Sequence, residues 1–386
     1  MNKPLIIALD AKRIVRNGTG LGSYGRTLVG DLARLEGVDL RLYAPDAGRE
    51  DLRRQVPVRP NLHYVYPSAS VSLPVVSGLC KAYWRSRGIV AQLQADGVQL
   101  YHGLSGELPV GIRRSGIRSV VTIHDLIFLR HPEYYHWMDV QIYKRKFLQA
   151  LREADRIVAI SECTRRDICE LGGVPKERVD LIYQSCAPRF SAPSDRHLVD
   201  EVCRRYQLPR RYVLCVGSVE ERKNAMLLVR ALPLLPADVH VVLVGRPTKY
   251  SQQVVAEAGR LGVAHRLHLL HGVPDEHLPA IYAGAEVFAY PSRYEGFGIP
   301  IIEAVSMGLP VVACTGSCLE EAGGPDNLYV GPDDAGAMAH ALQQLFRGAD
   351  GRQQRIDSSR QYIRRFEGTD AAAKFLDLYR ELAAGL

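Results

Sequence analysis

Two glutamates stand eight positions apart in a stretch that also contains two glycines and a proline. The stretch SRYEGFGIPIIEA covers residues 292–304 and carries the carboxylates of Glu295 and Glu303. Pro300 suits the first turn of a helix, where the missing N–H of proline costs nothing. Glu295 would then lie in the loop and Glu303 about one turn into the helix, both near its positive end. The carboxylates could accept hydrogen bonds from sugar or ribose hydroxyls while free amides face anionic oxygens. The binding candidates in this stretch are Glu295, Gly296, Phe297, Gly298, Ile299 and Glu303.

Two adjacent cations follow another expected strand. The strand YVLCV runs into Gly217, and Arg222 and Lys223 come just before a helical pattern that begins near Asn224. Basic side chains beside a helix start, at the carboxyl end of a strand, can clamp a diphosphate. We therefore expect Gly217, Arg222 and Lys223 to bind an anionic ligand, with both cations also acting in catalysis.

A glycine-rich segment near the start contains the spacing G-x-G-x-x-G at Gly20, Gly22 and Gly25, with Asp46 about twenty residues further on. That spacing suggests a dinucleotide site. However, the fingerprint should begin where its strand ends, and nine residues separate Asp10 from Gly20. A flexible loop that closes over a phosphate or an acceptor through Gly20 and Gly22 fits better.

His124 and Asp125 close the expected strand SVVTIHD. A histidine at the carboxyl end of a strand can bond a sugar hydroxyl, although a lone histidine is as often structural. The aromatic residues that follow, Tyr134, Tyr135 and Trp137, could stack on an acceptor sugar or simply anchor the next helix.

Short apolar runs alternate with longer helical patterns along the chain, which is typical of parallel βαβ units. The expected strands cover residues 4–11, 38–45, 61–67, 98–103, 118–125, 156–161, 179–184, 212–218, 239–245, 266–273, 286–292, 310–315 and 327–331. Residues 185–211 are rich in charge and proline and read as a linker between two domains. Two helical patterns end the chain, around 351–365 and 369–384.

Composition sets the wider limits. A chain of 386 residues with 47% hydrophobic content can fill two domains. A net charge of +7 suits an anionic small ligand or a lipid surface but is too small to indicate nucleic acid. The eight scattered cysteines suggest buried, reduced thiols in the cytoplasm. The N-terminus reads as a first strand rather than a signal peptide, and no window resembles a membrane-spanning helix.

Taken together, these motifs resemble the family 4 glycosyltransferases, which have the GT-B fold, over nearly the full chain. The resemblance is carried by Glu295 and Glu303 in EGFGIPIIEA, by ERKN at 221–224, by GTGLGSYG at 18–25, by 123–126, and by GVPDE at 272–276. The fold that it implies is α/β, with two Rossmann-like doubly wound domains facing a central cleft and C-terminal helices crossing back to the first domain. It implies an acceptor domain over 1–190, a nucleotide-sugar domain over 191–364 and a crossover segment over 365–386.

The resemblance also implies roles. Glu295 would hold hydroxyls of the transferred sugar, Glu303 the ribose, and Arg222 with Lys223 the diphosphate. His124 would lie beside the donor sugar, and Arg246, Gly272 and Val273 would border the base. Many relatives carry an arginine directly after the strand glycine, where this chain has Ser218.

The expected activity is therefore retaining transfer of a hexosyl group from a nucleotide-sugar to a glycan or lipid-linked saccharide. GDP-mannose is slightly favoured because the 122–126 and 131–135 region looks like polysaccharide mannosyltransferases, and UDP-hexoses or UDP-N-acetylhexosamines stay open. No D-x-D triplet occurs in the chain, so we expect no metal and no cofactor. The basic-aromatic stretches at 79–88 and 143–153 suggest peripheral contact with the inner face of a membrane.

Three alternatives compete with this interpretation. A dehydrogenase would use the G-x-G-x-x-G spacing to bind a nicotinamide cofactor. A sugar-binding protein without chemistry would have two similar lobes but is usually exported. A sugar-nucleotide epimerase of the same fold would convert the donor and need no acceptor.

Overall fold

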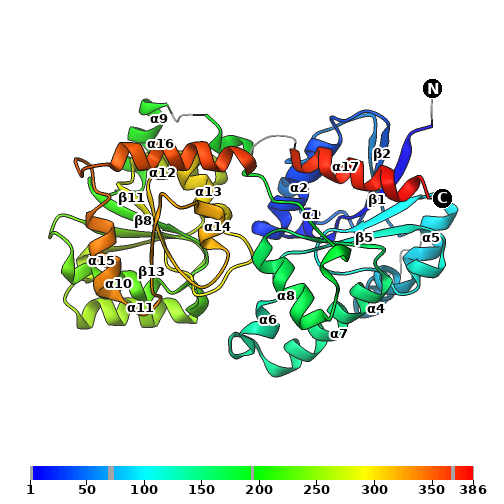
Figure 1. Ribbon diagram of the computed structural model, residues 1–386, viewed down its shortest axis with the longest axis horizontal. Coiled ribbons are helices and arrows are strands. Elements are labelled where there is room, and N and C mark those ends of the chain that lie inside the picture. Colours follow the sequence, from blue (N-terminus) through cyan, green and yellow to red (C-terminus); the bar gives the residue numbers. More distant parts are fainter. Residues whose placement is uncertain (1–2, 68–73, 193–194, 367–369, 386) are drawn as a thin grey trace. The chain divides into compact units, whose positions relative to one another are not determined.

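The computed structural model describes residues 3–67, 74–192, 195–366 and 370–385 (Figure 1). The chain divides into two compact units, one formed by residues 1–185 with 368–386 and the other by 186–367. Each unit is a parallel sheet with helices on both faces, so each is described by itself.

The first unit contains a seven-stranded sheet in the order β3-β2-β1-β4-β5-β6-β7. Its strands are β1 (Leu5–Asp10), β2 (Val38–Tyr43), β3 (Leu62–Val65), β4 (Leu100–Gly103), β5 (Arg118–Ile123), β6 (Arg156–Ala159) and β7 (Val179–Leu181). Because successive side chains point to opposite faces, β1 sends Ile7 and Leu9 to one core and Ala8 to the other.

Helices cover both faces of this sheet. One core is closed by α1 (Lys12–Arg16), α2 (Gly20–Leu32) and the C-terminal helix α17 (Asp370–Ala383). The other is closed by α5 (Ile89–Ala95), α7 (Trp137–Glu153) and α8 (Glu162–Gly172). The remaining helices of this unit are α3 (Glu50–Arg53), α4 (Pro74–Tyr83) and α6 (Ile127–Arg130). Phe375 and Tyr379 of α17 are fully buried, which ties the end of the chain to this first unit.

The second unit contains a six-stranded sheet in the order β10-β9-β8-β11-β12-β13. Its strands are β8 (Tyr212–Val216), β9 (His240–Val244), β10 (Leu267–Leu270), β11 (Val287–Tyr290), β12 (Val311–Cys314) and β13 (Leu328–Val330). The helices are α9 (Arg196–Arg205), α10 (Ala225–Ala231), α11 (Lys249–Arg260), α12 (Leu278–Gly284), α13 (Ile299–Ser306), α14 (Leu319–Gly323), α15 (Ala335–Gln343) and α16 (Arg352–Ile363). Helices α10, α11 and α15 bury one face of this sheet.

In both sheets the order in which the chain adds strands reverses at a defined point. In the second sheet the chain moves outward from β8 to β9 on one side, and β11 pairs with β8 on the other. The first sheet has the same arrangement about β1 and β4. Ligands of open parallel sheets usually bind outside the carboxyl ends of the strands at such a switch point. The loops after β8 and β11 are therefore the places where chemistry is expected in the second unit.

The predicted strands are confirmed, including the first one near the N-terminus. The two C-terminal helices are confirmed as α16 and α17, although residue 369 lies outside the described residues. The prediction of a linker over 185–211 is wrong in part. Residues 196–205 form α9, whose first turn is capped by the Asp195 side chain and whose Val202 is buried. The charged, solvent-facing side of that helix concealed its period in the sequence.

Two smaller expectations also need correction. The cysteines are all free thiols, but Cys80 is exposed and Cys169, Cys186 and Cys203 are only partly buried. The glycine-rich segment is not a flexible loop, because Gly20, Gly22 and Gly25 all lie within α2. Among the helices of the described residues, none has the length and apolar character needed to cross a membrane.

Candidate active site

Glu295 forms ion pairs with both predicted cations of the second unit. Its Oε2 lies 2.9 Å from Arg222 Nη1, and its Oε1 lies 2.5 Å from Lys223 Nζ. Glu295 is buried, which opposes ionisation, but the charges of Lys223 and Arg222 outweigh burial and lower the pKa of Glu295 to about 2. The carboxylate is thus ionised at any physiological pH, and it neutralises two cations that would otherwise be poorly solvated.

Backbone geometry brings these side chains together although Lys223 and Glu295 are 72 residues apart in the chain. Arg222 and Lys223 end the short 3-10 turn Glu221–Lys223, and Asn224 follows in the left-handed region with a φ of 55°. The buried Asn224 side chain donates to the Pro291 carbonyl at 3.1 Å and to the Pro332 carbonyl at 2.8 Å. The first bond joins the loop after β8 to the loop after β11, and the second joins it to the loop after β13.

Arg222 adds two further ties between the same loops. Its Nη1 donates to the Tyr294 carbonyl at 2.6 Å, and its own carbonyl accepts from the Arg293 amide at 2.9 Å. The loop that carries Glu295 is therefore held in place by the residue that Glu295 neutralises.

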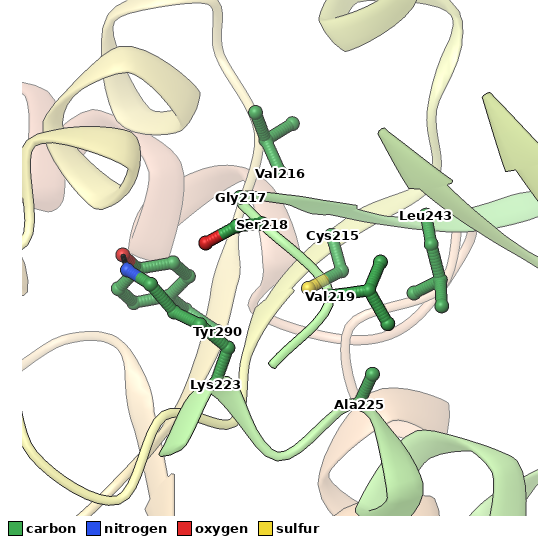
Figure 2. A pocket seen from close by; sticks show the side chains of 9 residues that line it. All are labelled: Cys215, Val216, Gly217, Ser218, Val219, Lys223, Ala225, Leu243 and Tyr290. Carbon is green, nitrogen blue, oxygen red and sulfur yellow. Dashed lines mark hydrogen bonds between the residues drawn. The ribbon is translucent and has the colours of Figure 1, made fainter. Parts of the chain in front are cut away.

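A small cavity lies beside Lys223 at the end of β8 (Figure 2). Gly217, Ser218 and Tyr290 line it, and Lys223 Nζ donates to the Tyr290 hydroxyl at 2.6 Å. In Figure 2 the Ser218 hydroxyl points toward the ends of Lys223 and Tyr290. The short side chain of Ser218 leaves this space between Lys223 and the end of β8.

The close approach of two strand ends explains the glycines here. A Cβ on Gly245, after β9, would lie 1.9 Å from the Gly217 carbonyl oxygen. Gly217 itself has a φ of 150°, which favours glycine. Arg246 follows Gly245; its side chain is exposed, and its backbone carbonyl accepts from the Val219 amide at 3.0 Å.

The second glutamate of the pair has a different environment. Glu303 lies in α13, one turn after Gly298, and accepts a hydrogen bond from the Tyr282 hydroxyl at 2.9 Å. Burial raises the pKa of Glu303 to about 7, despite the Tyr282 bond that lowers it. At neutral pH this carboxyl group is therefore only partly ionised, unlike Glu295.

The loop between the two glutamates is held in place by contacts with Cys318 and Phe366. The Cys318 thiol lies 3.1 Å from the Glu295 carbonyl and 2.9 Å from the Phe297 carbonyl, and it is buried. Phe297 packs edge-on against Phe366 with ring centroids 5.2 Å apart. Gly298 begins α13 with a φ of 113°. Phe297 thus anchors the loop, whereas Gly296 and Ile299 contribute backbone near the helix start.

Three other candidates of the second unit lie at the carboxyl ends of neighbouring strands. Gly272 and Val273 follow β10, and Gly272 is exposed with a φ of 66°. Together with Arg246 after β9, they line up beside the loop after β8, because the strand order is β10-β9-β8-β11. The structure therefore brings Arg222, Lys223 and Glu295 into contact. It places Arg246, Gly272 and Val273 at the carboxyl ends of the neighbouring strands.

His124 lies in the first unit, directly after β5. Its Nε2–H donates to the Leu104 carbonyl at 2.8 Å, and its Nδ1 accepts from the Gln184 amide at 2.7 Å. Burial lowers the pKa of His124 to about 4, so the ring is neutral. Both ring nitrogens have protein partners, and the Tyr24 ring packs edge-on at 4.7 Å. A contact with a sugar hydroxyl would therefore require one of these bonds to open.

A second histidine, His102 of β4, is part of the core. It bonds the Tyr379 hydroxyl at 2.6 Å and the Thr122 hydroxyl at 2.8 Å, and burial lowers its pKa to about 3. His102 thus links α17 to the sheet and is structural.

The glycines of α2 serve packing more than flexibility. A Cβ on Gly22 would lie 1.8 Å from the Asn17 carbonyl oxygen, and one on Gly25 would lie 2.8 Å from Ile14. Gly20, by contrast, is exposed with open space around it. Because α1 intervenes between β1 and these glycines, the strand-turn-helix geometry of a dinucleotide site is absent from this segment.

Sequence reasoning missed several residues that position the site. Tyr290 and Tyr282 lie inside an apolar strand and helix, and Cys318 lies in the loop just before α14, and no spacing marks any of them. Gln184, which orients His124, falls at the end of a predicted strand. Among the described residues, no group of three or more His, Cys, Asp or Glu side chains is arranged to hold a metal ion.

Comparison with known proteins places the chain in a family. Residues 18–186 match the model described as Glycosyltransferase Family 4, and residues 210–348 match the model described as Glycosyl transferases group 1. Together the two models cover most of both units. The chain belongs to the family 4 glycosyltransferases.

A curated relative agrees with this family. The chain is 33% identical over 252 residues to the O-antigen chain mannosyltransferase B of Escherichia coli, covering 64% of this chain and 65% of that protein. The chain spans about a third to two thirds of the length of the curated relatives that it matches.

Two solved structures match nearly the whole chain. A sucrose-phosphate synthase from Thermosynechococcus elongatus superposes with a TM-score of 0.78 at 20% identity, covering 99% of this chain and 100% of that one. Anabaena HepE, solved with UDP and glucose, superposes with a TM-score of 0.74 at 17% identity, covering 98% and 100%. The predicted GT-B fold, with its two parallel-sheet α/β domains, is confirmed.

Proposed function

We propose that this family 4 glycosyltransferase transfers a hexosyl group from a nucleotide-sugar to a glycan or lipid-linked saccharide, with retention of configuration. The observation that carries the proposal is the cluster of Arg222, Lys223 and Glu295 at the switch point of the second sheet. Two cations and one carboxylate at this position can bind a diphosphate and orient the hydroxyls of the sugar attached to it.

The ion pairs of Glu295 suggest how donor binding proceeds. In the free protein Glu295 occupies both cations. A diphosphate brings more negative charge than one carboxylate, so it would take over Arg222 and Lys223 and release Glu295 toward the sugar. We therefore propose that donor binding is an exchange of anions on the same two cations.

Charge development explains why this exchange helps catalysis. As the bond from the anomeric carbon to the diphosphate lengthens, negative charge grows on the departing oxygen. Lys223 and Arg222, fixed by Tyr290, Asn224 and the loop carbonyls, stabilise that charge without having to reorganise. Removing such a donor typically costs about 3 to 4 kcal/mol of transition-state stabilisation.

Other contacts complete the proposed donor site. Glu303 would accept hydrogen bonds from the ribose, and Arg246, Gly272 and Val273 would border the base. Gly296, Gly298 and Ile299 would present backbone at the start of α13. The cations and this helix end take the part that a metal plays elsewhere, so we propose no metal and no cofactor.

Retention is proposed through attack from the side of the leaving group, with a diphosphate oxygen taking the proton of the acceptor. A carboxylate nucleophile beneath the ring is the familiar alternative. Glu295, which the cations hold ionised, is the one carboxylate of the donor cluster, and trapping it as a glycosyl ester would refute the proposed route.

GDP-mannose is the proposed donor. The mannosyltransferase relative supports it, because that protein is named for mannose transfer. UDP-hexoses are the second candidate, since HepE was solved with UDP and glucose. We propose that the acceptor belongs to cell-surface polysaccharide or lipopolysaccharide synthesis and is reached by peripheral contact at the cytoplasmic face of a membrane.

The experiment is a thermal-shift panel of UDP, GDP and their sugars in the presence of chelator. A ligand at about 100 times its Kd should stabilise the protein by roughly 2.7 kcal/mol. A shift with one base and its sugars identifies the donor class. If no nucleotide shifts the melting temperature, the proposed function is wrong; if shifts require a divalent metal, only the metal-independent part is wrong.

A further inference from the structure

The two ring nitrogens of His124 face partners of opposite kinds. The Nε2 atom lies 2.8 Å from the Leu104 carbonyl, which can only accept a hydrogen bond. The Nδ1 atom lies 2.7 Å from the side-chain nitrogen of Gln184, which can only donate one. A proton is therefore required on Nε2 and excluded from Nδ1. The two partners together set both the tautomer and the charge of the ring, because an imidazolium would need a second acceptor.

Gln184 reaches His124 because the strands that precede them lie two positions apart in the first sheet. His124 follows β5 and Gln184 follows β7, with β6 between them. The segment after β7 is held against β6 by the Ile182 amide, which donates to the Ala159 carbonyl at 3.1 Å. Gln184 itself is only 7% exposed, so its amide has little access to solvent.

Other contacts fix the orientation of His124. The Tyr24 ring packs edge-on against the imidazole with centroids 4.7 Å apart, and its hydroxyl lies 3.3 Å from that of Thr122. The Thr164 hydroxyl donates to the backbone carbonyl of His124 at 3.1 Å. A rotation of the ring would therefore break the Gln184 bond and disturb the packing of Tyr24.

A cavity borders the His124 ring on the side of the Leu104 carbonyl. Ser105 and Gly106, which follow Leu104, line this cavity together with His124. Gln184 is not among the described residues that line it. A sugar hydroxyl in the cavity could thus take over the Nε2–H bond from Leu104 while the Gln184 bond stays intact.

The charged groups around the ring also favour its neutral form. Those that face the same cavity are Arg13, Glu107, Asp125 and Lys146. Glu107 pairs with Lys146 at 3.0 Å, so these two charges offset each other. Burial lowers the pKa of His124, the bond to the Leu104 carbonyl raises it, and the charge of Arg13 lowers it further. Gln184 is the partner that blocks the second proton directly.

A neutral ring matters at this position because of the charge that the reaction develops. Cleavage of a glycosidic bond passes through a state that resembles an oxocarbenium ion, with positive charge on the sugar ring. An imidazolium beside that charge would repel it, whereas a neutral imidazole can still bond a sugar hydroxyl.

We propose that Gln184 is a positioning residue that keeps His124 neutral, protonated on Nε2 and fixed in orientation beside the donor sugar. The part that concerns the sugar rests on the proposed function. Gln184 acts through His124 and does not itself touch the substrate.

The charge of the ring is measured by nitrogen-15 NMR on protein labelled at its histidines. The chain has 12 histidines, so a His124→Gln variant identifies the signals of His124. In the wild type at neutral pH we expect a proton on Nε2 and none on Nδ1. In Gln184→Glu the carboxylate accepts a hydrogen bond from Nδ1, so both nitrogens should be protonated. Gln184→Met has no donor for Nδ1, so its ring should take up the second proton at a higher pH than the wild type.

Two controls show whether these effects are specific. Gln149→Glu makes the same substitution at a half-buried glutamine of α7, whose amide donates to the Leu108 carbonyl at 2.9 Å. It should leave the His124 ring neutral. His102, fully buried between two hydroxyl groups, is an internal reference that should stay neutral in every variant. The melting temperature of each variant shows whether it is folded.

Turnover tests the part of the proposal that concerns the reaction. Release of GDP from GDP-mannose, or of UDP from UDP-glucose, is followed with water as the acceptor of the sugar. Below neutral pH we expect Gln184→Glu to lower kcat at least roughly tenfold while KM changes less than about threefold. The difference from the wild type should shrink as the pH rises and the ring loses its second proton. Gln149→Glu should follow the wild type at every pH.

Three results would overturn the proposal. The wild-type ring could carry protons on both nitrogens at neutral pH, which would mean that the Gln184 oxygen faces Nδ1. The His124 signals could be the same in the wild type and in both Gln184 variants. The ring of Gln184→Glu could be charged without any loss of kcat. The NMR measurement needs no nucleotide, so its failure is distinct from that of the nucleotide panel, whereas a wild type that cleaves neither donor would refute the proposed function.

Discussion

Replacing Glu295 with glutamine should lower the free energy of unfolding of the ligand-free protein and raise its affinity for a nucleoside diphosphate. The amide keeps the size of the side chain but removes the negative charge that Arg222 and Lys223 share. Both cations are mostly buried, with exposed fractions of 15% and 16% for their side chains. They would then face each other without a carboxylate between them.

The magnitude follows from the buried pairs. Removing one partner of a buried ion pair typically costs roughly 3 to 5 kcal/mol, so the free energy of unfolding should fall by about that amount. In the wild type a diphosphate must displace Glu295, and a hydrogen bond to a charged group is worth roughly 1.5 to 3 kcal/mol. The variant has no such bond to break, so its affinity for UDP or GDP should rise at least tenfold or so.

The turnover rate of the Glu295→Gln variant should fall, although its affinity rises. The variant no longer orients the sugar hydroxyls by charge, and a small misplacement can lower the rate about a hundredfold. Titration calorimetry with UDP and GDP measures the affinity, denaturant unfolding measures the stability, and sugar transfer measures the rate.

Glu220→Gln provides the matched control. Glu220 also pairs with Arg222, at 3.0 Å, but its side chain is 37% exposed. Because exposed pairs contribute only about 0 to 1 kcal/mol, this variant should change stability and affinity little. If folded Glu295→Gln binds the diphosphate no better than the wild type, the idea that Glu295 occupies the anion site is refuted.

Other substitutions test separate parts of the structure. Lys223→Ala should lower both nucleotide affinity and turnover, and a variant with normal values for both would remove this lysine from the site. Glu303 has a pKa near 7 in the fold against about 4.3 unfolded, so the folded state holds an extra proton between these values and loses stability as pH rises through them. Glu303→Gln should flatten that part of the curve in urea unfolding measured across pH, and an unchanged slope would contradict the raised pKa. Gly245→Ala should destabilise by roughly 1 to 3 kcal/mol in thermal unfolding because its Cβ meets the Gly217 carbonyl, whereas Gly259→Ala, in open space on α11, should be neutral or slightly stabilising.

Much of the architecture was predictable because strands buried on both faces leave continuous apolar runs. The thirteen strands, the two α/β domains and the C-terminal helices followed from those runs and from helical periodicity. Helix α9 was missed because only Val202 of its ten residues is buried, so its sequence resembles a charged linker.

The prediction of a flexible loop at the glycine-rich segment was wrong for a different reason. Spacing alone cannot distinguish a glycine that frees the backbone from one that makes room for a neighbour. Gly25 makes room for Ile14 of α1 and Gly22 for the Asn17 carbonyl just after it, and only the packing of this segment against α2 reveals it.

The sequence by itself determined the residue types of the site, since the carboxylates of Glu295 and Glu303 and the cations of Arg222 and Lys223 stand in recognisable motifs. Only the tertiary structure decided which of them meet. Two glutamates with the same side chain acquire pKa values of about 2 and about 7, because one lies against two cations and the other lies partly buried beside a tyrosine hydroxyl. Charge depends on local sequence, but its solvation and its partners depend on loops that the sheet order brings together from distant parts of the chain.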